Sequence, residues 1–298
     1  GSELIIQAKI GMPQGARILV ERNARLVISQ GGVVTRGDCV APHWKGIQVE
    51  GNSALAQPDI ALPGPLPPLN NNAQTGQVVL LKGGTIEWAE IGVSAGRDMP
   101  QELWGGLVYA NEGKFRNNFR DLDFMPYAFP NKSRFIDTDF WSNIDDIDIT
   151  QGVWIWGANG IEFNECSFSA YDFEAIRVFD ARIQVTNGNI FWRNERGISL
   201  EATYPSAASA VIGGEQYQEN LFWENRYHIV GQAVGGVQSG QLYALDIINN
   251  EFTHGEFGVV VSGPSYYRIG GNHFAGPMSA GGLMFHSGYN SMFFSTAL

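Results

Sequence analysis

The sequence is poor in charge, and it has no long apolar run. Charged residues make up only 16% of the 298 residues, and an acidic excess gives a net charge of −11. That charge argues against nucleic acid, and against an anionic membrane surface, as a partner. No stretch is long and apolar enough to span a bilayer, so we expect no membrane insertion. A phosphate-binding loop, a dinucleotide fingerprint and a serine nucleophile elbow are also missing from the sequence.

Metal-binding motifs are equally scarce. Cys39 and Cys166 are the two cysteines, and they lie too far apart for a metal-ligand motif. Cys166 immediately precedes a Ser-Phe pair of the repeat described below, where a buried thiol packs as a small apolar residue. The five histidines show no ligand spacing. We therefore expect two free thiols and no cofactor, apart from the Ca²⁺ considered below.

The sequence also lacks the 3.6-residue apolar stripe of an amphipathic helix. Short runs of β-forming residues alternate instead with Gly, Asn and Asp, and glycine alone accounts for 37 residues. These features predict an all-β protein with almost no helix.

One short pattern recurs along the chain: an aromatic residue, polar positions that include an Asn, then a small residue and an aliphatic residue. The clearest copies begin at Phe191-Trp192-Arg193-Asn194 and Phe222-Trp223-Glu224-Asn225. The anchors are Ile86, Phe115, Phe140, Phe168, Phe191, Phe222, Phe252 and Phe274. A variable, β-rich period in the twenties to low thirties indicates a solenoid.

The fold that fits is a single right-handed parallel β-helix of roughly 9–10 coils. Its anchors would point inward, and Asn118, Asn143, Asn194 and Asn225 would stack as a side-chain ladder. We expect one domain over residues 1–298, cut from a longer protein. It would have N-terminal coils at 3–52, a loop excursion rich in Pro and Asn at 53–76, and repeating coils at 77–298.

These repeats resemble those of secreted right-handed β-helix proteins, a family that includes pectate and alginate lyases, polygalacturonases and many adhesins. The stretch from Gly15 to Val20 and from Lys45 to Asn52 more narrowly resembles segments of large Bacteroidetes surface proteins exported by the type IX system. The resemblance implies a secreted or cell-surface location, and other domains of a longer parent chain as partners.

Equivalent outward positions of successive coils should form columns. The position after the first aliphatic residue reads Gln48, Ser94, Asp123, Asp148, Arg177, Ser199, Val230 and Val260. Two neighbouring carboxylates favour a Ca²⁺ site at Asp123 and Asp148. The resemblance to β-helix lyases then implies that Arg177 binds or deprotonates a uronate, which makes Asp123, Asp148 and Arg177 the candidate catalytic residues. The alternative is a solvated charge ladder without function.

A polygalacturonase-like site fails on distance. Its candidates are Asp145-Asp146, His254-Gly255 and Arg268-Ile269. Asp146 and His254 are about four coils apart, or roughly 19 Å at the spacing of strands. Paired carboxyl groups of a glycosidase flank one bond at less than about 10 Å. We therefore exclude this type of glycosidase.

Tryptophans supply the strongest binding signal. Trp154 and Trp156 alternate with aliphatic residues, so both indoles should face outward as a platform for sugar or protein, unless an insertion covers them. Trp141, Trp192 and Trp223 follow inward anchors and should form an outward column at one corner, in which Trp192 and Trp223 are consecutive and Trp141 is two coils away. This column is equally a possible docking seam for a domain or subunit.

The sequence thus favours a non-catalytic, rigid scaffold or recognition segment of a secreted or cell-surface bacterial protein. Its partner would be a glycan or a surface protein. A polysaccharide lyase acting on uronates with Ca²⁺ is the alternative, and a purely structural spacer is the third possibility.

Overall fold

The computed structural model describes residues 1–37, 43–59, 74–143, 150–203, 208–214, 216, 218–233, 243–262, 266–286 and 292–294. The chain divides into two compact units, and each is described by itself. Unit 1 comprises Gly1–Asp139 and Ala158–Ile161, and unit 2 comprises Phe140–Gly157 and Glu162–Leu298. The expectation of one continuous domain stays a prediction.

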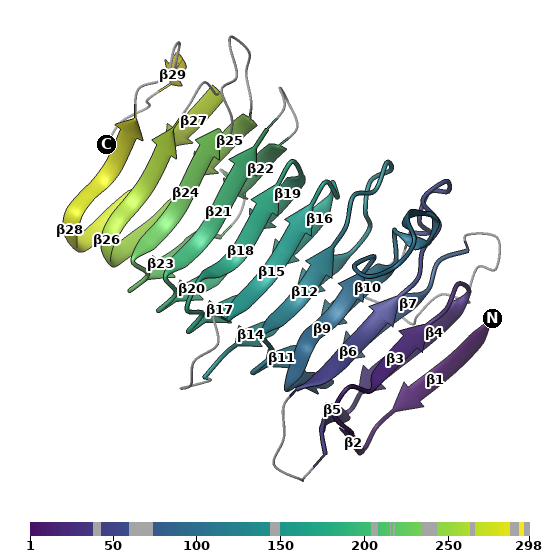
Figure 1. Cartoon of the computed structure of the whole chain (residues 1–298). Helices are drawn as coiled ribbons and strands as arrows, with labels where there is room; N and C mark the ends of the chain where they lie inside the picture. Colours follow the sequence, from purple (N-terminus) through teal and green to yellow (C-terminus); the bar gives the residue numbers. More distant parts are fainter. Residues whose placement is uncertain are drawn as a thin grey trace. The chain divides into compact units, whose positions relative to one another are not determined.

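Both units are parallel β-helices in which each coil contributes up to three short strands (Figure 1). Every strand pairing described below is parallel and joins a strand to its counterpart one coil away. Hydrogen bonds therefore run between coils rather than within hairpins. Within the described residues the helical content is the 3₁₀ turn η2 (Gln101–Leu103), so the prediction of an all-β protein with almost no helix is confirmed.

The strands of unit 1 form three ranks. The first rank contains β1 (Ser2–Ile6), β4 (Ala24–Ser29), β7 (Gln77–Leu81), β10 (Leu107–Asn111) and β13 (Arg134–Ile136). The second rank contains β2 (Lys9–Met12), β5 (Val33–Arg36), β8 (Thr85–Glu87) and β11 (Lys114–Arg116). The third rank contains β3 (Arg17–Val20), β6 (Trp44–Val49), β9 (Ala89–Ala95) and β12 (Arg120–Phe124).

Unit 2 repeats this plan. Its first rank contains β16 (Ile161–Asn164), β19 (Arg182–Thr186), β22 (Ala208–Gly213), β25 (Tyr243–Ile248), β27 (Tyr266–Gly270) and β29 (Met292–Phe294). The second contains β14 (Asp139–Trp141), β17 (Ser167–Ser169), β20 (Ile190–Trp192) and β23 (Asn220–Trp223). The third contains β15 (Gln151–Trp156), β18 (Glu174–Phe179), β21 (Arg196–Ala202) and β24 (Tyr227–Ala233). β26 (Asn250–Ser262) and β28 (His273–His286) run through the second and third ranks.

The predicted aromatic anchors form a stacked column inside unit 2. Phe168 lies 4.8 Å from Phe191, and Phe191 lies 4.6 Å from Phe222, with rings within 5° of parallel. Phe140 and Phe252 extend the column by stacking on Phe168 and Phe222 respectively. These distances match the spacing of parallel strands, because each coil lifts the equivalent side chain by one strand. The inward half of the repeat was therefore predicted correctly.

Two asparagine ladders support the turns beside this column. The predicted ladder is confirmed where the Asn194 amide donates to Asn225 Oδ1 at 2.8 Å. The residues before these asparagines, Arg193 and Glu224, have left-handed backbone conformation with φ of 55° and 54°, so the amides satisfy backbone groups at a tight bend. A second ladder was not predicted, and it comprises Asn189, Asn220, Asn250 and Asn272.

Two further sequence predictions concern loops and thiols. The excursion expected at 53–76 falls between β6 and β7, and its residues 60–73 lie outside the described part of the chain. Cys166 is a buried thiol that is not in a disulfide, and its Sγ lies 3.3 Å from the carbonyl oxygen of Asn164. Cys39 lies outside the described residues.

Candidate functional site

The candidate site is the outer face of the third rank in unit 2, formed by β15, β18, β21 and β24, which lie side by side in Figure 1. Ile176 and Val178 are fully buried, whereas Arg177 and Phe179 between and after them are partly exposed. The strands therefore alternate between the interior and this face.

The alternation is reset at the start of each strand. Glu174 pairs with Arg196, and Ile176 pairs with Ile198. The residue between them in each strand, Ala175 or Gly197, is not part of the ladder. A Cβ placed on Gly197 would meet the Phe222 ring at 3.2 Å, which shows that this position faces the interior. Arg196 and its partner Glu174 consequently stand on the outer face with Arg177.

The predicted column is in register over most of its length, although Ser94, Asp123 and Ser199 within it are buried. In unit 2 Arg177 pairs with Ser199, Ser199 with Val230, and Val230 with Val260. In unit 1 Ser94 pairs with both Gln48 and Asp123.

The coil that contains Asp148 departs from the prediction. Trp154, rather than Asp148, pairs with Arg177. The distance from the anchor to the first inward aliphatic residue is 13 residues in this coil (Phe140 to Val153), against 7 from Phe191 to Ile198. This insertion shifts the strand along the sequence, and a comparison of the repeats within one sequence does not reveal it. Asp148, together with Asp145 and Asp146, lies in 144–149, outside the described residues.

Asp123 of unit 1 is engaged in ion pairs. Its side chain is only 1% exposed, and its Oδ2 accepts from Arg120 Nη1 at 2.6 Å and from Arg97 Nε. The backbone N–H of Arg97 also donates to Ser94 Oγ at 3.1 Å. Asp123 therefore holds the segment that follows β9 in place through Arg97, and the guanidinium groups of Arg97 and Arg120 neutralise its charge. A carboxylate in this setting does not fit Ca²⁺, which needs several oxygen ligands and excess negative charge.

Arg177 is likewise paired. Its Nη2 donates to both carboxylate oxygens of Glu201, at 3.0 and 3.1 Å. Its guanidinium lies 5.4 Å from the centre of the Trp154 ring. A cation held in this way is not free to capture the carboxylate of a uronate unless the Glu201 pair opens.

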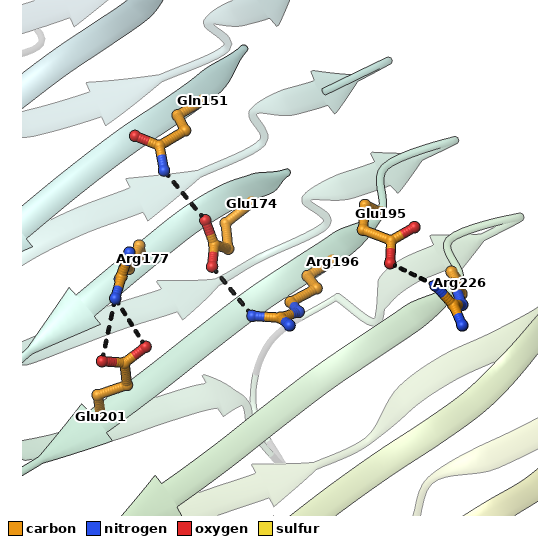
Figure 2. A network of polar contacts seen from close by, with 7 residues as sticks. All are labelled: Gln151, Glu174, Arg177, Glu195, Arg196, Glu201 and Arg226. Carbon is orange, nitrogen blue, oxygen red and sulfur yellow. Dashed lines mark hydrogen bonds and ion pairs between the residues drawn. The ribbon is translucent and has the colours of Figure 1, made fainter. Parts of the chain in front are cut away.

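Glu174 is the functional candidate that the sequence analysis missed. It is 1% exposed, and it accepts hydrogen bonds from Arg196 Nη1 at 3.2 Å and Gln151 Nε2 at 3.3 Å (Figure 2). Burial raises the pKa of the Glu174 carboxyl, and the nearby guanidinium groups of Arg177 and Arg196 oppose that rise. Buried groups with raised pKa values occur often at functional sites. The sequence feature that could have indicated this site is that Gln151, Glu174 and Arg196, all polar, occupy equivalent positions in three successive coils.

A second charged cluster follows along the same side. Arg226 donates to Glu195 at 2.9 Å and to Glu256 at 2.6 Å, and the Glu195 contact is drawn in Figure 2. The hydrogen bonds to these two carboxylates raise the pKa of Arg226 further above its ordinary value. One guanidinium therefore serves two carboxylates here.

The Trp154–Trp156 platform is oriented as predicted. Val153 and Ile155 are buried, whereas Trp156 is 40% exposed. The Trp156 ring meets Phe179 edge to face, with centroids 6.2 Å apart and planes at 73°. Because the Trp154 ring is covered by Arg177, the exposed part of the platform is Trp156 with Phe179.

The predicted corner column of tryptophans has Trp192 and Trp223 in consecutive coils, as expected. Trp192 pairs in register with Trp223, and their rings stack at 5.7 Å. Glu224 binds Trp192 Nε1 at 3.2 Å and Arg193 Nε at 2.7 Å. Trp141 and Trp223 are 36% and 38% exposed. Ser169 occupies the position next to Trp192 in the preceding coil, so an indole is missing there.

Metal-ligating side chains do not converge in the part of the chain that is described: no group of three or more His, Cys, Asp or Glu residues could hold an ion. His43 is buried against the Phe119 ring, with centroids 3.6 Å apart. His228 is buried in unit 2 beside the stacked rings of Phe222 and Phe252.

Comparison with known proteins gives one family and several distant structures. A family model described as "Periplasmic copper-binding protein (NosD)" matches residues 131–295, which is more than half of the chain. The search of curated proteins gave no match.

Among solved structures, the chain is similar to PfbA, a surface adhesin of Streptococcus pneumoniae, with 9% identity and a TM-score of 0.35, covering 98% of this chain and 83% of that one. It is also similar to a point mutant of the periplasmic alginate epimerase AlgG, with 10% identity and a TM-score of 0.25, covering 98% and 78%. Likeness at this level carries no conclusion about activity, and the type IX origin stays a prediction. The family match over residues 131–295 decides the assignment: the chain belongs to the family described as periplasmic copper-binding protein (NosD).

Proposed function

We propose that this protein is a non-catalytic recognition segment that acts outside the cytoplasm and binds carbohydrate on the outer face of the third rank in unit 2. The observation that carries the proposal is Trp156, which is 40% exposed and braced by Phe179 on a regular strand. An indole held in this way offers a flat apolar surface whose position is fixed by the sheet beneath it.

Polar groups beside the platform suit a sugar. Arg177 Nη2 donates to both carboxylate oxygens of Glu201 next to Trp154, so the two charged groups are held in one place. Small-ligand sites combine an apolar surface with a few fixed polar groups. The C–H face of a sugar ring would pack on Trp156, and its hydroxyls would meet the donors and acceptors of the ion pair.

The proposed location rests on the family. Its printed description is periplasmic, and the described residues contain no helix long and apolar enough to cross a membrane. The proposed partners are a glycan or a surface protein, together with other domains of a longer parent chain.

The copper named in the family description does not fit the residues described here. Copper binding favours Cys, Met and His side chains brought together around one point. Cys166 is buried at a carbonyl oxygen, and His228 is buried beside two phenylalanine rings, with its Nδ1 bonded to the Asn225 amide. We therefore assign no copper-dependent step to these residues.

A matched pair of tryptophan variants tests carbohydrate binding. Trp156→Ala should abolish binding of a responding polysaccharide, measured by titration calorimetry. Trp223→Ala removes an equally exposed indole (38%) at the other corner and should leave binding unchanged. Equal loss in both variants, or no binding to any glycan of a broad array, would contradict the proposal.

A uronate lyase is the competing function, favoured by one observation, the raised pKa of the buried Glu174 carboxyl beside Arg196 and Arg177. Lysis creates an unsaturated uronate that absorbs in the near ultraviolet. We expect no such absorbance from alginate, pectate or glycosaminoglycans, with or without Ca²⁺. A rising signal that is lost in Glu174→Gln would establish the lyase instead.

A further inference from the structure

The charges on the outer face of unit 2 are balanced in pairs. Arg177 is held by Glu201, and Arg196 is held by Glu174. The neighbouring Arg226 is shared by Glu195 and Glu256. The network thus contains three guanidinium groups and four carboxylates, so it presents no excess positive charge to a ligand.

Capture of an acidic sugar would have to break one of these pairs. The best-placed cation is Arg177, because it adjoins the platform at Trp154. Its partner Glu201 has a side chain only 9% exposed. If Arg177 turned to a uronate, the Glu201 carboxylate would remain buried without its counter-charge, which is strongly unfavourable.

An uncharged sugar needs no such rearrangement. A guanidinium has five N–H donors, and the bonds to Glu201 use only part of them. A carboxylate has about four acceptor sites, so Glu201 also keeps capacity for a hydroxyl donor. Sugar hydroxyls both donate and accept, and they can join the intact pair while the ring packs on Trp156.

We propose that the Trp156 platform takes an uncharged polysaccharide and discriminates against uronates, because Glu201 holds Arg177 and the network has no spare positive charge. This inference rests on the proposed carbohydrate function and narrows its ligand to one chemical class.

Homogalacturonan provides a matched probe, because methyl esterification removes its charge while the backbone stays the same. Titration calorimetry at low salt would compare the highly esterified polymer, its de-esterified form, and a panel of neutral mannans, xylans and β-glucans. We expect binding among the uncharged polymers, and at least about tenfold weaker binding of the de-esterified form, since like charges facing each other oppose association.

Glu201→Gln releases Arg177 and should shift preference toward the acidic polymer. Glu224→Gln is the control, because it releases Arg193 from a comparable pair at the tryptophan corner and should leave the preference unchanged.

Tighter or equal binding of de-esterified homogalacturonan by the wild-type protein would overturn the inference, even if Glu201→Gln failed to fold. Absence of binding to every polymer would instead overturn the carbohydrate function itself, so the two failures are distinguishable.

Discussion

The buried His228 should make unit 2 lose stability in mild acid. Its side chain is fully buried, and burial lowers its pKa to about 4 from the ordinary 6.5. Since the unfolded chain keeps the ordinary value, unfolding takes up a proton between these two pH values. Stability contributed by the neutral ring is therefore fully present above pH 6.5 and is lost as pH falls to 4.

The asparagine ladder gives a structural reason for the neutral form. Asn225 Oδ1 accepts from Asn194 at 2.8 Å, and Asn225 Nδ2 donates to the Phe191 carbonyl oxygen at 2.9 Å. This network orients the Asn225 amide so that Nδ2 also donates to His228 Nδ1 at 3.1 Å. Protonation of Nδ1 would set one N–H against another, in addition to burying a charge.

The magnitude follows from the pKa difference. A difference of about 2.5 units, at about 1.4 kcal/mol per unit, amounts to about 3 kcal/mol once the pH is below 4. At pH 5 the loss is already about 2 kcal/mol by the same relation. Both values are large against the usual stability of a domain.

Denaturant unfolding followed by circular dichroism, at pH 7.5 and at pH 5, measures this loss. His228→Gln should be less stable at neutral pH but should lack the acid-dependent component of about 2 kcal/mol. Subtracting the two proteins removes the contribution of Glu174, which also titrates above its ordinary range. His254→Gln is the control, because His254 is exposed, and it should behave as wild type. An unchanged acid-dependent loss in His228→Gln would refute the reasoning.

Two further predictions concern the stability of the scaffold, and a third concerns calcium binding. Phe191→Ala opens a gap in the stacked column and should lower the free energy of unfolding by about 3–5 kcal/mol, measured by the same denaturation; a loss below about 1 kcal/mol would mean that the column is not close-packed. Asn220→Ala removes the hydrogen bonds to Asn189 and Asn250 and should cost about 1–3 kcal/mol, whereas Gln218→Ala, outside the ladder, should be near neutral. Ca²⁺ should not raise the melting temperature through Asp123, because Arg97 and Arg120 occupy its carboxylate; a rise that Asp123→Asn abolishes would restore the calcium site.

The fold was largely predictable because it repeats. An error in one copy of the pattern is corrected by the others, and the anchors Phe168, Phe191 and Phe222 stack as the repeat predicts. Prediction failed in the coil from Phe140 to Val153, where an insertion changed the strand position and Trp154 took the place assigned to Asp148. Because the length of the repeat varies from coil to coil, its length alone does not show which loop within a coil contains an insertion.

The contacts of the outward side chains were harder to predict from the sequence, because their partners lie in other columns. Arg177 and Asp123 were correctly placed in their columns, but their partners Glu201 and Arg97 lie at other register positions or in a loop. Glu174 was missed because the residue after it, Ala175, is buried and breaks the simple alternation. Contacts between side chains of different columns depend on the length and direction of each side chain, and the repeat pattern does not specify these.

The sequence by itself determined the coil, its inward aromatic column and the outward position of Trp154 and Trp156, because apolar side chains that recur once in every repeat must be buried together. Only the tertiary structure decided which charges meet. Pairing depends on distances of a few ångströms between different coils, and that pairing turned two predicted catalytic residues, Asp123 and Arg177, into neutralised members of ion pairs.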